Sequence, residues 1–148
     1  MAYWRLFYHF VWTTKNREPL LTPDIETSVH RFLHAEANKM YVPLFVVGGI
    51  EDHAHVLVAV RPSVSPADFM HQLKGSSSRF VTQAFEWQEG YGVFSVSEDD
   101  VPDVIRYIEN QKQHHAQGTV VAAWEQTHHW NIGPEKRADT LGSGHRTD

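Results

Sequence analysis

The sequence predicts an α+β fold, a four-stranded antiparallel sheet with helices packed on it, from the order of its apolar patterns. Segments typical of strands and helices follow one another as strand, helix, strand, strand, helix, strand, and a further helix comes last. This order is that of a ferredoxin-like split β-α-β sheet with an appended C-terminal helix. Because such a sheet carries helices on one face only, we expect the last helix or a partner subunit to cover the other.

The first strand and helix are expected in the opening forty residues. Residues 6–14 are rich in aromatic and branched side chains on both faces, which predicts a central strand that is covered on both sides. A polar turn, Lys15–Pro19, ends it. Thr22 then has the character of a helix N-cap with Pro23 at the first helical position, and this helix should run to about Lys39.

A hairpin of two strands is expected next. Residues 42–50 form an apolar run in which the pair Gly48 and Gly49 predicts a bulge or a turn. The partner strand is residues 56–60, directly after two histidines. Ser65, as an N-cap followed by Pro66, starts the second helix.

The second helix and the elements after it carry one expected irregularity. The run 75–78, Gly-Ser-Ser-Ser, has low helical propensity and predicts a kink or a close backbone approach. Residues 91–96 alternate enough for a fourth strand. A last helix should start between 97 and 102, with one apolar stripe and a neighbouring stripe that contains Tyr107, Gln111 and His114.

Composition bounds the class of protein. A chain of 148 residues fits one domain, expected over residues 1–132, whereas residues 133–148 are predicted to be a disordered tail. The chain has no cysteine, which excludes disulfide scaffolds and thiolate metal sites. No apolar stretch approaches about 18 residues, so we expect a cytoplasmic protein without a membrane span.

The formal net charge of −5, with histidine neutral, argues against a protein that coats nucleic acid through bulk positive charge. Distribution matters more than the total, because four acids are concentrated within residues 98–103. The basic residues cluster elsewhere, at Lys15, Arg17, Lys74 and Arg79. Lys74 and Arg79 could bind backbone phosphates or form an ordinary exposed helix face.

The residues with the clearest chemical meaning are His53 and His55, which precede the third strand. Alternate side chains of an extended chain point the same way, so the two imidazoles stand side by side. They are either ordinary partly buried histidines or half of a divalent-metal site. Gln111 offers a carbonyl oxygen as third ligand, and this donor set suits Mg²⁺ or Mn²⁺. Asp52 could be a fourth ligand or a hydrogen-bond acceptor for one histidine.

Tyr107 lies one helical turn before Gln111. If Gln111 reaches a metal, the phenol can lie near a phosphate that the metal holds. His114 and His115 could act as a general base, as further ligands or as a solvated helix end.

Several blocks of the chain, taken together, resemble the single-tyrosine HUH transposases, which include IS200-like insertion-sequence transposases and REP-associated tyrosine transposases. The resemblance covers roughly residues 3–117. It is carried by residues 8–17 (YHFVWTTKNR), 52–58 (DHAHVLV), 73–79 (LKGSSSR), Trp87 with Gly90-Tyr91, and 107–111 (YIENQ) followed by His114-His115. One departure is Ala54, which is smaller than the hydrophobe usual between the two histidines.

The resemblance implies that His53 and His55 bind a divalent metal, that Gln111 is the third ligand and that Tyr107 is the nucleophile. It further implies a single-stranded or hairpin DNA substrate, with Lys15, Arg17, Lys74 and Arg79 as contacts to the DNA backbone. A 5′-phosphotyrosine intermediate is also implied, as is a homodimer in which the tyrosine helix of one subunit completes the histidine site of the other. A different class of function is a non-catalytic module that binds single-stranded nucleic acid through sheet aromatics such as Phe7, Tyr8 and Trp12. A third reading is a relic that keeps the fold without activity.

Overall fold

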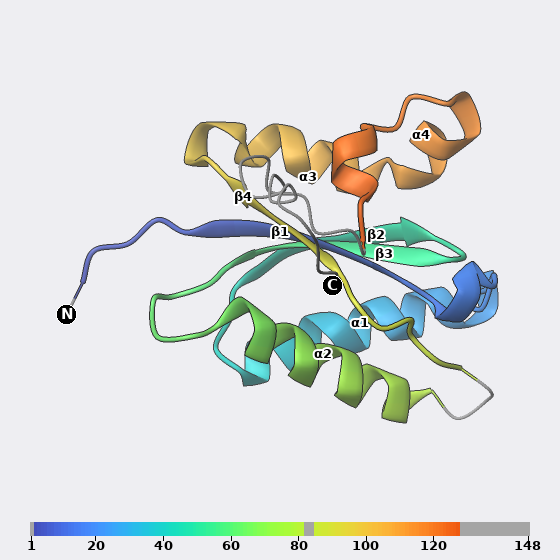
Figure 1. Cartoon of the computed structure of the whole chain (residues 1–148), viewed down its shortest axis with the longest axis horizontal. Helices are drawn as coiled ribbons and strands as arrows, with labels where there is room; N and C mark the ends of the chain where they lie inside the picture. The colour runs from blue at the N-terminus through green and yellow to red at the C-terminus, as the bar shows by residue number, and fades with distance from the viewer. Residues whose placement is uncertain (1, 82–84, 128–148) are drawn as a thin grey trace, which may run out of the picture.

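The computed structural model describes residues 2–81 and 85–127 and contains the expected antiparallel sheet, with strands in the order β2-β3-β1-β4 (Figure 1). The strands are β1 (Phe7–Thr13), β2 (Leu44–Ile50), β3 (His53–Ala59) and β4 (Gly92–Val96). The helices are α1 (Pro23–Lys39), α2 (Pro66–Phe80), α3 (Val101–Glu109) and α4 (Gln111–Gln117). This element order and strand order confirm the ferredoxin-like prediction.

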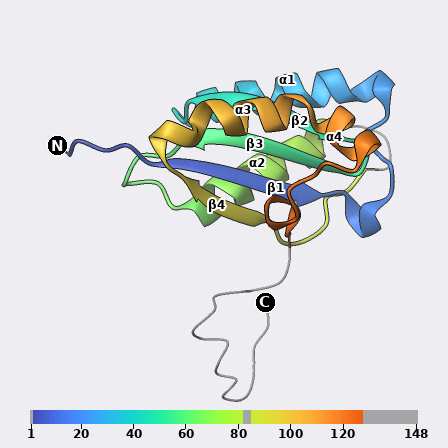
Figure 2. The ribbon, with the colours of Figure 1, turned by 90° about the horizontal axis from the view of Figure 1, so that it is seen from above.

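The sheet lies between two helical layers. Helices α1 and α2 cover one face, and α3 covers the other (Figures 1 and 2). The larger apolar cluster lies under α1 and α2 and includes the even-numbered β3 residues Ala54, Val56 and Val58. The smaller cluster lies under α3 and includes Leu57. The last helices therefore cover the second face within one chain, which was one of the two predicted solutions.

The two inner strands position the histidines. β1 pairs with β3 on one side and with β4 on the other, as expected for a strand that is apolar on both faces. In the β1–β3 register Thr13 lies opposite His53 and Val11 opposite His55. Because β3 is also paired with β2, both histidines stand on a strand that is hydrogen-bonded along both edges.

The helix starts agree with the sequence, but the expected kink in α2 is absent. The Ser65 hydroxyl accepts a hydrogen bond from the Asp68 N–H at 3.1 Å and caps α2. The helix then continues through residues 75–78 to Phe80. Ser76 and Ser77 donate their hydroxyls to the carbonyls of Gln72 and Leu73, at 2.9 and 2.8 Å, so their polar groups are satisfied inside a continuous helix.

The glycine pair is neither a turn nor the bulge. Both glycines lie inside β2, the irregularity in pairing lies between Leu44 and Val46, and the turn to β3 is formed by Glu51 and Asp52. Gly48 has another function. A β-carbon at this position would lie 2.0 Å from the carbonyl oxygen of Ile108, so only glycine permits the close approach of α3 to β2.

The predicted last helix is two helices. Asn110, with φ −104° and ψ 26°, interrupts the ladder between α3 and α4. After α4, Gly118 adopts φ +70°, a left-handed conformation that ends the helix and reverses the chain. A 3-10 turn, Ala122–Glu125, follows and returns to the sheet, and Trp124 packs there against the smaller apolar cluster.

The described part of the chain ends at residue 127. The end of the domain predicted to reach residue 132 and the tail predicted at 133–148 both lie outside it. Within residues 2–81 and 85–127, no helix combines the length and the apolar character that crossing a bilayer requires.

Candidate active site

His53 and His55 lie side by side on the α3 face of the sheet. Both side chains are buried, and their ring centroids are 5.0 Å apart. Leu57, two residues on, is on the same face under α3. The strand alternation inferred from the sequence is thus confirmed, and the imidazoles face the helices that carry Tyr107 and Gln111.

Each imidazole is held through its Nδ1 atom. The carboxylate of Asp52 lies 2.7 Å from Nδ1 of His53. Nε2 of His9, a buried residue of β1, lies 2.8 Å from Nδ1 of His55. Asp52 is therefore a hydrogen-bond partner of a histidine in this structure, the second of its two predicted roles. Both Nε2 atoms remain directed toward α4 and the turn Ala122–Glu125.

Gln111 and Tyr107 reach the histidines within one chain. Oε1 of Gln111 lies 2.9 Å from Nε2 of His53. The Tyr107 ring packs edge-on against His55, with centroids 5.9 Å apart, and its hydroxyl accepts a hydrogen bond from the N–H of Val121 at 3.0 Å. Lys112 fixes this arrangement, because its ammonium pairs with Glu26 and donates to the carbonyl of Gly49 at 3.1 Å.

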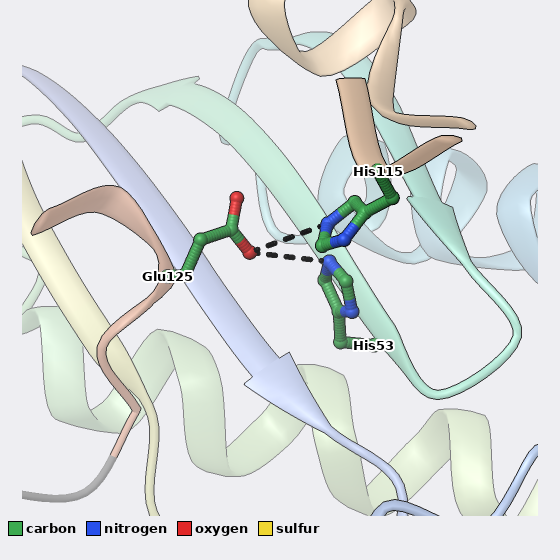
Figure 3. A group of neighbouring side chains, drawn as sticks. All are labelled: His53, His115 and Glu125. Carbon is green, nitrogen blue, oxygen red and sulfur yellow. Dashed lines mark ion pairs between the residues drawn. The ribbon is translucent and has the colours of Figure 1, made fainter. Parts of the chain in front are cut away.

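Glu125 connects all of these groups, and sequence reasoning missed it. Its Oε1 atom lies 3.3 Å from Nε2 of His53 and 3.3 Å from Nε2 of His55. Its Oε2 atom accepts hydrogen bonds from the Tyr107 hydroxyl and, at 3.4 Å, from the Gln111 amide. Figure 3 shows the carboxylate directed toward the imidazoles of His53 and His115, from a segment outside the sheet. The metal ligands expected from the sequence and the expected nucleophile thus share one carboxylate.

His115 belongs to this cluster, whereas His114 does not contact the imidazole pair through a hydrogen bond that the structure describes. Nε2 of His115 lies 3.1 Å from Oε1 of Gln111 and 3.7 Å from Oε1 of Glu125 (Figure 3). His114 instead bonds the Thr119 hydroxyl and stacks against the Tyr107 ring, with centroids 4.8 Å apart. Of the predicted roles, a further ligand fits His115 and a helix-end residue fits His114.

The donor atoms fit a small divalent cation. Two ligand atoms about 2.1 Å from one cation and at right angles to each other are about 3.0 Å apart. The observed distances are close to this value. Nε2 of His53 lies 2.9 Å from Oε1 of Gln111, and Oε1 of Glu125 lies 3.3 Å from Nε2 of His53 and from Nε2 of His55. His53, His115 and Glu125 also form a group whose ligand atoms all lie within 4.8 Å of one another.

The electrostatics of the cluster follow from burial and from the shared carboxylate. Burial acts to lower the pKa of His53, but hydrogen bonds to Asp52, Glu125 and Gln111 outweigh it and raise this pKa to about 9. Burial would raise the pKa of Glu125, but hydrogen bonds from His53, His55 and Tyr107 hold it below its ordinary value. Glu125 is therefore an anion beside the cationic ring of His53, whereas burial lowers the pKa of His55 and of His115.

The Tyr107 phenol is a weak acid in this state. Burial and the hydrogen bond to Glu125 raise its pKa to about 12. Attack by its oxygen therefore requires an acceptor for the phenolic proton and positive charge nearby.

The four predicted DNA-contacting residues divide between two places. Arg17 lies beside the histidine site, with its guanidinium 3.7 Å from the Asp52 carboxylate. Lys15 and Lys74 line a cleft of about 840 Å³ between α2 and residues 86–91. Lys74 donates to the carbonyls of Gln88 and Gly90, at 2.8 and 2.9 Å, so it holds this loop. Arg79 is exposed at the end of α2.

The chain matches a known family model and a curated relative. Residues 2–111 match the family model described as "Transposase IS200 like". The ISDra2 transposase TnpA of Deinococcus radiodurans is 26% identical over 119 residues, which cover 73% of this chain and 85% of that protein.

Two solved structures share the fold. A crystal structure of a transposase-family protein from Deinococcus radiodurans R1 has a TM-score of 0.61 and 28% identity, covering 75% of this chain and 95% of that one. A REP-associated tyrosine transposase bound to a REP hairpin has a TM-score of 0.61 at 12% identity, covering 81% and 76%, and shows likeness of fold. Because the family model matches well over half of the length of this chain, the chain belongs to the IS200-like transposases.

Proposed function

We propose that this transposase nicks and rejoins single-stranded DNA at hairpin-associated sites, in a metal-dependent reaction that passes through a 5′-phosphotyrosine at Tyr107. One observation carries the proposal. The carboxylate of Glu125 contacts the Nε2 atoms of His53 and His55 with one oxygen and the Tyr107 hydroxyl with the other. A single carboxylate group therefore bridges the Tyr107 hydroxyl and the imidazole pair. A phosphate group has comparable dimensions, so it could bridge the same atoms.

His53, His55 and Gln111 are the proposed ligands of Mg²⁺ or Mn²⁺, and Glu125 is added to them as an anionic oxygen donor. Such a cation prefers six ligands, so this set leaves positions for a phosphate oxygen and water. When bound, the cation would polarise the phosphate and stabilise the negative charge that develops on it. Asp52 keeps the His53 ring oriented, with its carboxylate 2.7 Å from Nδ1.

Tyr107 carries the covalent step. Its hydroxyl oxygen forms a bond to the DNA phosphorus, and the bond between phosphorus and the 3′-oxygen breaks. The phenolic proton passes to Glu125, to which it is already hydrogen-bonded, and the departing 3′-oxygen takes up a proton to become a hydroxyl. The phosphodiester energy is kept in the phosphotyrosine, so a 3′-hydroxyl can reverse the step without ATP.

A hairpin substrate is proposed by analogy with the REP-associated transposase, which was solved bound to a REP hairpin. Arg17 supports this, because its half-exposed guanidinium borders the site beside Asp52. Lys15, Lys74 and Arg79 stay proposed backbone contacts. The non-catalytic alternative has less support, because Phe7 and Trp12, two of the aromatics it relies on, are buried in the sheet.

A homodimer remains a prediction. The tyrosine, the glutamine and both histidines come together within one chain, so a second subunit is not needed to complete this site. We therefore propose that catalysis occurs in cis whether or not the protein dimerises.

The test is adduct formation. Incubation with hairpin-containing single-stranded oligonucleotides and Mn²⁺ or Mg²⁺ should give a covalent protein–DNA species on a denaturing gel. The species should disappear with EDTA and in Tyr107→Phe, but persist in the control Tyr3→Phe, which removes the hydroxyl of an 89% exposed tyrosine. Binding of many hairpins without any adduct would contradict the proposal and favour the non-catalytic module.

A further inference from the structure

The partner of His55 at Nδ1 is another histidine, His9. His9 is fully buried on β1, and its Nε2 lies 2.8 Å from Nδ1 of His55. The residue directly opposite it in the β1–β3 register is Leu57, two positions from His55 on the same face. His9 thus lies behind His55, away from the atoms proposed to bind the cation.

The chemistry of a neutral imidazole fixes the direction of this hydrogen bond. A neutral imidazole has one N–H donor and one acceptor nitrogen. If Nε2 of His55 gives its lone pair to a cation, its one hydrogen must be on Nδ1. Nε2 of His9 then accepts that hydrogen, and the hydrogen of His9 must lie on its own Nδ1.

We propose that His9 is a positioning residue for metal binding: its Nε2 accepts the Nδ1–H of His55 and thereby selects the tautomer in which Nε2 of His55 can ligate. This inference rests on the proposed metal site. His9 does for His55 what Asp52 does for His53, but through a neutral group. The pair of ligands is therefore supported on one side by a carboxylate and on the other by an imidazole.

The surroundings of His9 hold it in this role. Its ring packs against Phe94, Tyr107 and Trp124, with centroids 5.7, 6.4 and 5.7 Å away. Within the described residues, Nδ1 of His9 is buried without a hydrogen-bond partner. A buried polar atom left unpaired is unfavourable for stability, so packing alone would favour an apolar side chain here. The bond to His55 is the interaction that an apolar residue would lose.

Two substitutions separate positioning from packing. His9→Phe keeps a planar ring and removes both nitrogens, whereas His9→Gln keeps an acceptor oxygen at similar reach. Mn²⁺ affinity, measured without DNA by electron paramagnetic resonance titration, should fall about 10- to 100-fold in His9→Phe. His9→Gln should recover most of this loss. Phe94→Leu alters the packing of the same ring without touching the hydrogen bond, and should bind Mn²⁺ like the wild type.

A measurement on the unaltered protein avoids any folding defect in the variants. Nitrogen-15 NMR of the histidine rings in the Mg²⁺-loaded protein should show His55 protonated at Nδ1 and His9 protonated at Nδ1. A loaded protein with His9 protonated at Nε2, or a folded His9→Phe with wild-type Mn²⁺ affinity, would overturn the role of His9 alone. A wild-type protein that binds neither Mn²⁺ nor Mg²⁺ would overturn the proposed metal site as well.

Discussion

Oε1 of Gln111 lies 2.9 Å from Nε2 of His53, although 58 positions separate the two residues in the chain. The contact joins the first residue of α4 to the first residue of β3. It brings an amide oxygen to the same side of the imidazole pair as Glu125. Four donor atoms from three segments therefore face one another, and each can be removed separately.

Removing the Gln111 carbonyl should weaken cation binding. Gln111→Leu keeps much of the side-chain volume but provides no ligand atom, so Mn²⁺ affinity should fall at least about 10-fold. Gln111→Glu keeps an oxygen and should bind better than Gln111→Leu. Gln113→Leu, at an exposed position of the same helix, is the matched control. Equal Mn²⁺ titrations for Gln111→Leu and the control would exclude Gln111 as a ligand.

Glu125→Gln tests the residue that the sequence did not single out. Loss of the carboxylate charge removes an anionic metal ligand and the base that takes up the Tyr107 proton, so we expect weaker Mn²⁺ binding and slower adduct formation. The rate of adduct accumulation at saturating metal isolates the second effect. Faster accumulation than in the wild type would mean that Glu125 obstructs the substrate instead of assisting it.

Gly48→Ala should separate α3 from β2. The added β-carbon would meet the Ile108 carbonyl at 2.0 Å, so the helix that carries Tyr107 must shift. We expect a loss of about 1–3 kcal/mol in the free energy of unfolding, measured with urea, and reduced adduct yield.

Gly75→Ala is the control for that substitution. Its β-carbon would meet only the Arg79 side chain, at 3.5 Å, within the continuous α2. The free energy of unfolding should rise by about 0.5–1 kcal/mol, because alanine is the better helix former. A destabilised Gly75→Ala would indicate that the glycine serves a purpose the helix geometry does not reveal.

Mixing two inactive variants tests catalysis in cis. Tyr107→Phe keeps the histidines and His53→Ala keeps the tyrosine, so a site shared between subunits would regain activity in the mixture. We expect no adduct above the sum of the separate proteins, because Lys112 ties α4 to Glu26 and Gly49 of its own chain. Recovery of activity on mixing would show that the helices exchange between subunits.

The sheet and the histidine pair could be predicted because short-range patterns encode them. The alternation in residues 53–59 fixes which side chains share a face, and Ser65 and Pro66 mark a helix start. The kink expected at residues 75–78 was wrong because helical propensity is a weak local preference. The serine hydroxyls bond to carbonyls of the preceding turn, and Ser77 accepts from the Trp87 indole at 2.8 Å.

Glu125 and His9 could not be found in the same way. Glu125 lies in a segment without periodicity, and it reaches the site only because Gly118 reverses the chain after α4. His9 lies in a run of apolar and aromatic residues. The pattern of this run indicates a buried strand, but it does not indicate that His9 approaches Nδ1 of His55. The contact depends on the β1–β3 register, which is a tertiary property.

The pairing of β3 along both edges has a consequence for how the site opens. Successive amides of β3 point alternately toward β1 and β2, so neither edge of the strand is open to solvent. The amides of His53 and His55 should therefore be protected from deuterium exchange for as long as the sheet stays folded. The turn Ala122–Glu125 has no such ladder and should open by local fluctuation. The two histidines then keep their positions throughout the lifetime of the native state, whereas the Glu125 carboxylate opposite them leaves and returns to the site many times within it.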